Sequence, residues 1–165
     1  MQQRNRTEDG FTLIELLIVM SIILILATLA IPAMQKTIKK ANQTSAVQSL
    51  HDINTQEASY HSDFPSHGYS CTLSALGGKA GAQPTAEAAG LIPEDLASGV
   101  KSGYLFTITN CTKVTVNNTD QITSYEINAV PQTLGKTGDF GYCTDGNEIR
   151  FDPKGGTNCT ELLTQ

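Results

Sequence analysis

The chain has 165 residues, so we expect one modest domain together with a membrane anchor, and no second catalytic domain. Its formal net charge is −5, and beyond Tyr60 the sequence holds 11 acidic against 6 basic side chains. This balance excludes a nucleic-acid binder that works through general electrostatic attraction, because such a protein needs a surplus of lysine and arginine.

The first predicted element is an apolar helix over residues 11–31, FTLIELLIVMSIILILATLAI, in which Glu15 is the single ionisable side chain. A helix of this length rises ~31 Å, which matches the ~30 Å hydrocarbon core of a bilayer. A simple one-pass anchor is the plainest interpretation, but it leaves Glu15 unexplained. A carboxylate at membrane depth costs roughly 2.5–3.5 kcal/mol on insertion scales and indicates a functional site with a specific partner.

The polar segment before this helix, residues 1–10, ends in Gly10. In an ordinary secretory signal the apolar stretch precedes the cleavage site and is discarded. Here the small residue comes first, so a cut after Gly10 would keep the apolar helix on the mature protein. The new amino group of Phe11 would then be a cation about one helical turn from Glu15. We therefore predict a cleaved, cytoplasmic leader and a charge pair between Phe11 and Glu15.

The helical pattern continues over residues 32–61 but becomes amphipathic. Pro32 cannot donate a hydrogen bond to the carbonyl of Thr28, so the helix is predicted to kink or open at this turn. Beyond Pro32, apolar residues recur at spacings of three and four among polar ones, which predicts one apolar stripe on a soluble helix. The stripe consists of Met34, Ile38, Ala41, Ala46, Leu50, Ile53 and Tyr60. The pair Phe64-Pro65 is the predicted stop.

Residues 62–165 are predicted to form a globular, β-rich domain. A loop region extends to residue 102 and contains a short helix that begins near Pro93, with Gly99 beyond its end. Strands are expected over residues 104–109, 113–116, 123–130, 140–143 and 148–151. The expected fold class is α+β, with the long amino-terminal helix packed on a small antiparallel sheet.

Two local patterns support this sheet. The pair Asp145-Gly146 predicts a hairpin between the last two strands. Alternation in the third strand places Tyr125, Ile127 and Ala129 on one face, which is expected to pack against the helix.

The four cysteines all lie beyond the membrane segment, without the paired short spacings of a zinc site. An even number in an oxidising compartment favours two disulfides. Three connectivities are possible. We favour Cys143–Cys159, because it closes a loop around the terminal hairpin, and by elimination Cys71–Cys111.

The other candidate sites are weak. The histidines His51, His61 and His67 follow no ligand spacing with Asp63, so no metal site is expected there. Acidic side chains near residues 145–148 and at Asp152 could offer oxygens to Ca²⁺, but a plain turn is the preferred interpretation. No catalytic constellation or phosphate-binding loop stands out, so we expect neither an enzyme nor a cofactor.

The segment GFTLIELLIVMSIILILATLAIP resembles the amino-terminal signature of type IV pilins and their pseudopilin relatives. The resemblance rests on Gly10, Phe11, Thr12, Leu13, Glu15 and Pro32, followed by the long helix. The stretch AGLIPEDLASGVKSGYLFTI, with the terminal hairpin and cysteine pair, also resembles bacterial members. The resemblance is strong over residues 9–60 and weaker beyond.

The resemblance implies a processing and assembly pathway. A prepilin peptidase would cut after Gly10 and methylate the new amine of Phe11. Glu15 would neutralise that amine during assembly, and the helix up to Pro32 would leave the inner membrane for the core of a filament. The implied partners are further copies of the chain, the inner-membrane platform and the assembly ATPase.

The chain departs from the family pattern in two respects. It has no glycine between residues 11 and 67, so any unwinding is expected to be limited to the turn before Pro32. Glu8 and Asp9 beside the cut site are less typical than a basic leader.

Three functions remain open on the sequence. The first is a subunit of an extracellular type IV pilus, and the second is a pseudopilin of a periplasmic type II secretion pseudopilus. The third is a membrane-tethered binding domain that does not polymerise.

Overall fold

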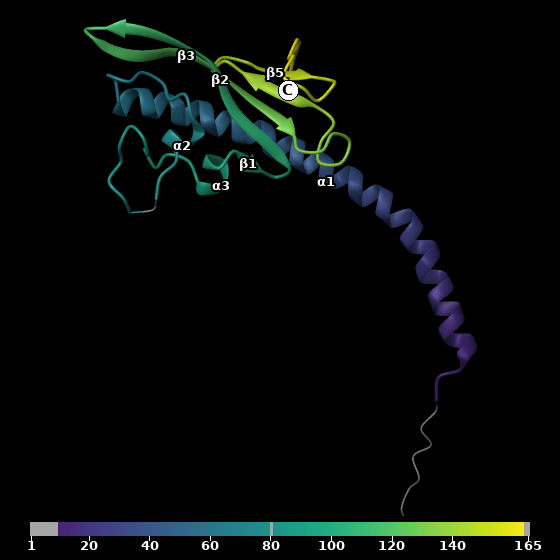
Figure 1. The fold of residues 1–165 in the computed structure, drawn as a ribbon. Helices are drawn as coiled ribbons and strands as arrows, with labels where there is room; N and C mark the ends of the chain where they lie inside the picture. The colour runs from purple at the N-terminus through teal and green to yellow at the C-terminus, as the bar shows by residue number, and fades with distance from the viewer. Residues whose placement is uncertain (1–9, 80, 164–165) are drawn as a thin grey trace, which may run out of the picture. The chain divides into compact units, whose positions relative to one another are not determined.

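A computed structural model describes residues 10–79 and 81–163 of the chain. The helices are α1 (Leu13–Asp63), α2 (Leu73–Leu76) and α3 (Glu94–Ala97). The strands are β1 (Val100–Lys101), β2 (Tyr104–Val116), β3 (Thr119–Pro131), β4 (Gly141–Thr144), β5 (Ile149–Asp152) and β6 (Glu161–Leu162) (Figure 1). The chain divides into two compact units between Thr37 and Ile38, and the second unit is called the head below. The predicted α+β class is confirmed.

The long helix α1 begins and ends close to the predicted residues. It ends at Asp63, and the N–H of Phe64 still donates to the Tyr60 carbonyl at 2.8 Å. Pro65 follows, and a residue before proline disfavours the helical conformation. The helix continues through Pro32, so a loss of helical structure there in an assembly stays a prediction.

The six strands form one antiparallel sheet in which every strand pairs with its neighbours in the chain, in the order β1 to β6. The longest pair is the hairpin β2–β3, which Figure 1 shows extending past the other strands. Its turn consists of Asn117 and Asn118, with φ angles of 51° and 65°. Asparagine tolerates this left-handed conformation better than most residues, so a two-residue turn forms here without glycine.

Strand β2 differs from its prediction, because it is one strand where the sequence indicated two. Thr109 pairs with Glu126 and Thr112 with Ser124, so two residues of β2 stand opposite Tyr125 alone. The extra residue forms a bulge, and Asn110 adopts a φ of 52° there. The first predicted strand stops where this bulge begins, and β2 is one strand because it pairs with β3 on both sides of the bulge. Strand β1, helix α2 and strand β6 were not predicted.

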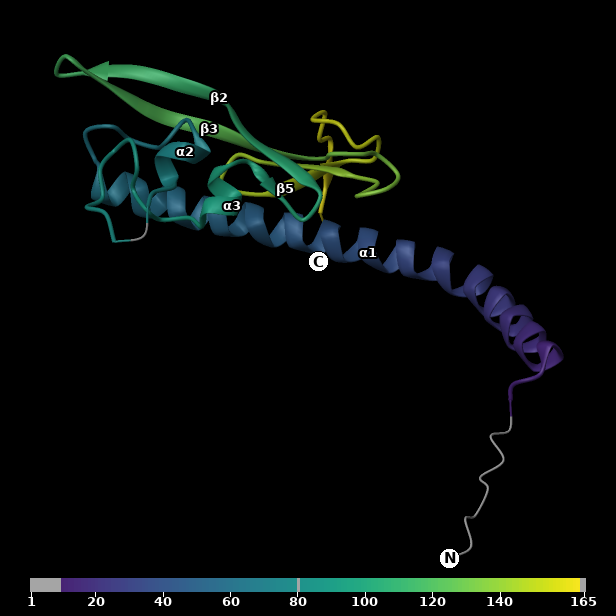
Figure 2. The ribbon, with the colours of Figure 1, turned by 60° about the horizontal axis from the view of Figure 1, so that its bottom comes forward.

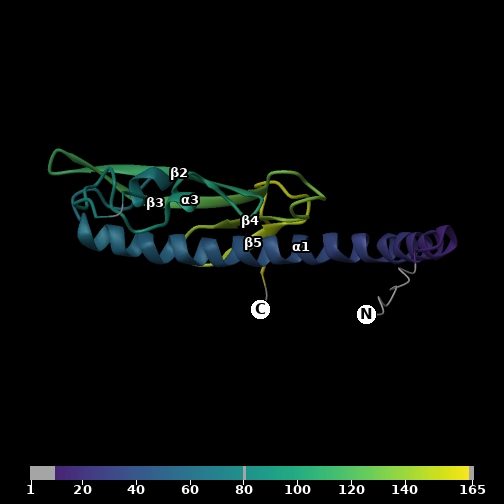
Figure 3. The same ribbon diagram turned by 90° about the horizontal axis from the view of Figure 1, so that it is seen from below.

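The core of the head lies between one face of the sheet and α1, as Figures 2 and 3 show. The predicted inward face of β3 is confirmed, since Tyr125, Ile127 and Ala129 are all buried. They meet Ala46, Leu50, Ile53 and Tyr60 from α1, and Tyr104 and Phe106 from β2.

The amino-terminal half of the predicted apolar stripe is wrong as a buried surface. Met34 and Ile38 are 66% and 47% exposed, and Ala41 is exposed too. Within the head, polar contacts attach residues 39–42 of α1 to the loop between β3 and β4. The Lys39 ammonium lies 2.8 Å from the Asp139 carboxylate, and the Asn42 side-chain amide donates to the Thr137 carbonyl at 3.0 Å. A regular spacing of apolar residues shows that a helix has an apolar face, but not which part of that face is covered.

Candidate functional site

The start of α1 is closed by reciprocal hydrogen bonds between Thr12 and Glu15. The Glu15 Oε2 atom accepts from the Thr12 backbone N–H at 3.0 Å and from the Thr12 hydroxyl at 2.8 Å. In return, the Glu15 backbone N–H donates to the Thr12 hydroxyl oxygen at 3.3 Å. This arrangement is a capping box, with Thr12 as the N-cap and Glu15 as the third helical residue.

The capping box adds a role for Glu15 that was missed at the sequence level. A Thr-x-x-Glu spacing directly before an apolar run signals such a cap. Gly10 and Phe11 are exposed, and a Cβ atom added to Gly10 would meet no heavy atom within 4 Å. A cut between them would create an amine one residue before the N–H that Glu15 already binds. The carboxylate is therefore held close to the end that such a cut would produce.

The helical surface that follows this cap is apolar and uncovered. Every side chain over residues 11–26 is exposed, with Phe11 at 86% and Leu13 at 88%. In the described part of the chain, α1 is the one helix whose length and composition would let it cross a membrane. Its hydroxyl groups are satisfied internally. Ser21 donates to the Leu17 carbonyl at 2.8 Å and Thr28 to the Ile25 carbonyl at 2.7 Å. Such pairing suits a helix whose surroundings offer no water.

The four cysteines form two disulfides in the head, Cys71–Cys111 and Cys143–Cys159. These are the pairs favoured from the sequence. The first joins the segment after α1 to the bulge of β2, and the second joins β4 to the chain beyond β5. Each fastens a segment with little regular structure to the central sheet.

The weaker candidate residues engage in ordinary local contacts. Across the described residues, no group of three or more His, Cys, Asp or Glu side chains could hold a metal ion. The His61 ring packs edge-on against Tyr69, with the ring centroids 4.9 Å apart. Asp145 lies 3.3 Å from the Arg150 guanidinium, and Asp152 accepts hydrogen bonds from the backbone of Lys154 and Asn158. The acidic side chains considered for Ca²⁺ thus stabilise their own turns.

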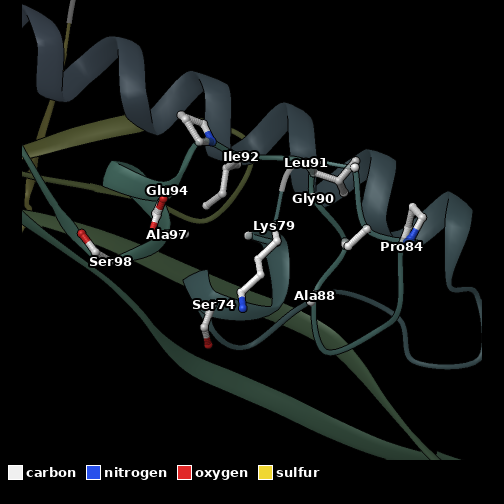
Figure 4. Close-up of a pocket in the computed structure, with 16 residues that line it drawn as sticks. Ser74, Lys79, Pro84, Ala88, Gly90, Leu91, Ile92, Glu94, Ala97 and Ser98 are labelled. Carbon is white, nitrogen blue, oxygen red and sulfur yellow. The ribbon is translucent and has the colours of Figure 1, made fainter.

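An open cleft of about 760 Å³ lies beside α2 and α3 (Figure 4). Much of its wall is glycine and alanine, including Gly77, Gly78 and Ala88. Its two charged residues, Lys79 and Glu94, are both exposed. A cleft with this lining offers shape but no buried polar group that would select a ligand.

One buried acid was not anticipated. Glu57 lies on the core side of α1 and is fully buried, although the sequence places it in a polar stretch, NTQEAS. Its carboxylate accepts hydrogen bonds from the N–H and the hydroxyl of Ser70 at 2.8 and 2.6 Å. Its position, four residues after Ile53 and three before Tyr60, places it on the predicted apolar stripe, and this spacing is the signal that could have found it.

Comparison with known proteins bears on the amino-terminal site. A family model described as the prokaryotic N-terminal methylation motif matches residues 5–31. The match includes the Gly10–Phe11 bond, Glu15 and the exposed apolar surface, and it does not extend to the head. No solved structure matches the chain. Proteins with this motif are in general structural subunits rather than enzymes. The chain therefore carries the amino-terminal methylation signature of type IV pilins and pseudopilins.

Proposed function

We propose that this protein is a structural subunit of a type IV pilus, which polymerises after its leader is cleaved and the new amine of Phe11 is methylated. The observation that carries the proposal is an uncovered apolar helix whose first turn is capped by the Glu15 carboxylate, a few residues after the bond that we expect to be cut. In the precursor, lipid covers this surface in the inner membrane. In the filament, the same surface of other copies covers it.

Apolar burial alone does not favour the filament over the membrane. Lipid tails are as apolar as leucine side chains, so moving the helix from lipid to a helix bundle yields little hydrophobic free energy. The charged pair is different. Two unit charges 4 Å apart attract by ~4 kcal/mol at an effective dielectric of 20, which is comparable to the insertion cost of one carboxylate. A pair between Glu15 of one copy and the Phe11 amine of another therefore rewards assembly and selects the register between copies, whereas a pair within one chain forms equally in the membrane.

Glu15 has two possible partners for this pairing. Its carboxylate is held by Thr12 at the start of its own helix, so the amine of the same chain is within one residue. The amine of a neighbouring copy would have to replace or share the Thr12 contacts. The prepilin peptidase, the inner-membrane platform and the assembly ATPase are the partners that this pathway requires.

The principal alternative is a pseudopilin that remains in the periplasm as part of a type II secretion system. Disulfides form in the periplasm as well as outside the cell, so their presence fits both classes. We favour the extracellular pilus because two covalent links in a head of this size suit a filament that bears mechanical load. The signature at residues 5–31 is common to both classes.

Sheared surface material from the bacterium that makes this protein tests the proposal. We expect thin filaments by electron microscopy, and mass spectrometry of their subunits should find an amino terminus at methylated Phe11. A deletion strain should lose the filaments and keep its secreted proteins. Loss of secretion with no surface filaments would support the pseudopilin, and an intact start at Met1 in the functional protein would exclude both.

A further inference from the structure

Glu57 has no role in the proposed assembly, and its surroundings are unusual for a carboxyl group. It occupies the core face of α1 between Ile53 and Tyr60, and its exposed fraction is 0%. No cation among the described residues forms an ion pair with it. A buried carboxylate without a counter-charge is expensive, so such a group tends to take up a proton instead.

The titratable groups near Glu57 in the described part of the chain are tyrosines and acids. Tyr60 on its own helix and Tyr125 on β3 are close enough for the Glu57 charge to raise the pKa of both hydroxyl groups. Glu87 acts on Tyr60 in the same way, Asp145 acts on Tyr125, and the Tyr69 ring packs edge-on against Tyr125 with the ring centroids 5.0 Å apart. Burial raises the pKa of Glu57 from 4.5 to about 7, and the two hydrogen bonds from Ser70 offset only part of this effect.

The hydrogen-bond geometry at Ser70 is complete when Glu57 is neutral. The Ser70 hydroxyl oxygen lies 2.6 Å from Glu57 Oε1 and 3.2 Å from the Thr72 carbonyl oxygen. A hydroxyl group has one hydrogen, so it cannot donate to both. If Glu57 is protonated, it donates to the Ser70 oxygen, and Ser70 donates onward to Thr72. If Glu57 is ionised, it can only accept, so the Ser70 hydrogen turns to it. The Thr72 carbonyl then loses its bond to Ser70 and keeps only the Ala75 N–H, at 3.2 Å, as a donor.

We propose that Glu57 and Ser70 form a pH-sensitive latch that fastens the segment between α1 and α2 to the core while Glu57 is protonated. Loss of the proton to solvent leaves a buried negative charge and breaks the Ser70–Thr72 bond. The latch acts within the head and does not depend on whether the head belongs to a pilus.

The latch controls a segment with several attachments. The backbone around Ser70 pairs with β3, because the Tyr69 N–H donates to the Ile122 carbonyl at 3.0 Å and the Ile122 N–H donates to the His67 carbonyl at 2.9 Å. Cys71 follows with its disulfide to Cys111. Thr72 is the N-cap of α2, where its side chain accepts from the Ala75 N–H. Helix α2 forms one wall of the cleft in Figure 4. Opening of the latch therefore loosens α2 and that wall, while the disulfide keeps the segment attached.

Hydrogen exchange on the full chain in detergent tests the latch. The amides of residues 65–78 are followed by mass spectrometry between pH 5 and 9, with the intrinsic pH dependence of exchange removed. In the opened segment Glu57 is hydrated and has its ordinary pKa. Protection should therefore fall by roughly tenfold per pH unit between about pH 5 and 7, and then level off.

Two variants identify the group responsible. Glu57→Gln imitates the neutral acid, because its amide nitrogen can donate to Ser70 and its oxygen can accept from the Ser70 N–H. At every pH from 5 to 9, the amides of this variant should keep the protection that the wild-type protein shows at pH 5. Glu148→Gln removes an exposed carboxylate from the same head and should keep the wild-type profile. A wild-type profile that is flat between pH 5 and 7, or one that Glu57→Gln shares, overturns the proposal.

A measurement on the wild-type protein keeps the proposal testable if Glu57→Gln does not fold. Infrared difference spectra should show a protonated carboxyl band that persists above pH 6 and disappears near pH 7. The loss of every such band below pH 5.5 would mean that Glu57 is ionised across the working range, and the latch would be wrong.

Discussion

Glu15 has one role that the structure shows and a second that we propose. Its backbone N–H and carboxylate exchange hydrogen bonds with Thr12 and so begin α1. Its charge would also neutralise the Phe11 amine that the proposed cleavage creates. A neutral acceptor can serve in a capping box, whereas only an anion can neutralise an amine. The two functions can therefore be separated by mutation.

Glu15→Gln should leave the subunit helical, processed and at normal abundance in the membrane, while filaments are reduced at least tenfold. The amide oxygen retains the Thr12 contacts, and the loss of ~4 kcal/mol of charge attraction removes the advantage of assembly. Quantitative blots of membrane and sheared fractions measure this. Thr12→Ser retains the hydroxyl and serves as the matched control. Normal filament number in Glu15→Gln would show that the charge of Glu15 does not drive assembly.

The burial of Glu57 also predicts how the stability of the head depends on pH. Its pKa is near 7 in the folded head and near 4.5 when hydrated, so the folded state binds the proton more tightly. The contribution of Glu57 to the free energy of unfolding should therefore be greatest below about pH 4.5. It should fall by roughly 3 kcal/mol as the pH rises to 7 and then stay constant.

Thermal unfolding of the full chain in detergent, followed by the near-ultraviolet signal of its tyrosines, measures this loss. Glu57→Gln should be the more stable protein at pH 8 and should not lose stability between pH 5 and 7. If stability fell equally with pH in both proteins, groups other than Glu57 would be responsible for the loss.

At the scale of elements, the head relies on its disulfides wherever regular structure is short. Helices α2 and α3 have four residues each, and β1 and β6 have two. Elements of this length contribute few backbone hydrogen bonds, so covalent links limit how far the segments between them can move. The sequence separations of the linked cysteines, 40 and 16 residues, determine how much each link restricts the unfolded chain.

Removing the disulfides singly should therefore have graded effects. In the chain-entropy model, replacing Cys143 and Cys159 by serine lowers the free energy of unfolding by ~3 kcal/mol, and the same change at Cys71 and Cys111 lowers it by ~4 kcal/mol. Denaturant titration compares the two double variants, and peptide mapping without reductant checks the pairing in the parent. A larger loss for the shorter loop would mean that native contacts, rather than loop closure, dominate.

For the whole molecule, the division between Thr37 and Ile38 separates two kinds of surface. The first unit exposes apolar side chains, whose contact with water is unfavourable. The head has its own core, with Leu50, Ile53 and Ile127 fully buried. The membrane anchoring and assembly that we propose thus concern the first unit.

A chain that begins at Ile38 should accordingly fold in water as a monomer with no free thiols. Size-exclusion chromatography and thiol titration measure this, with the full chain in the same buffer as the control that aggregates. Aggregation of the shortened protein would show that the head needs the first unit in order to fold.

The local features of this protein could be predicted from sequence because neighbouring residues determine them. The run over residues 11–31 specifies a helix that needs an apolar surrounding, and the spacing from Gly10 to Glu15 indicates where an amine and an acid could meet. The period of two in Tyr125, Ile127 and Ala129 assigned the inner face of the sheet, since side chains alternate along a strand.

Other features depended on contacts between residues distant in the chain. The bulge in β2, the exposed start of the apolar stripe and the burial of Glu57 all follow from which segments lie against one another. Glu57 is chemically the same residue as an exposed glutamate. Only the fold brings Ser70 and Tyr125 to it from other segments and excludes water from its carboxyl group.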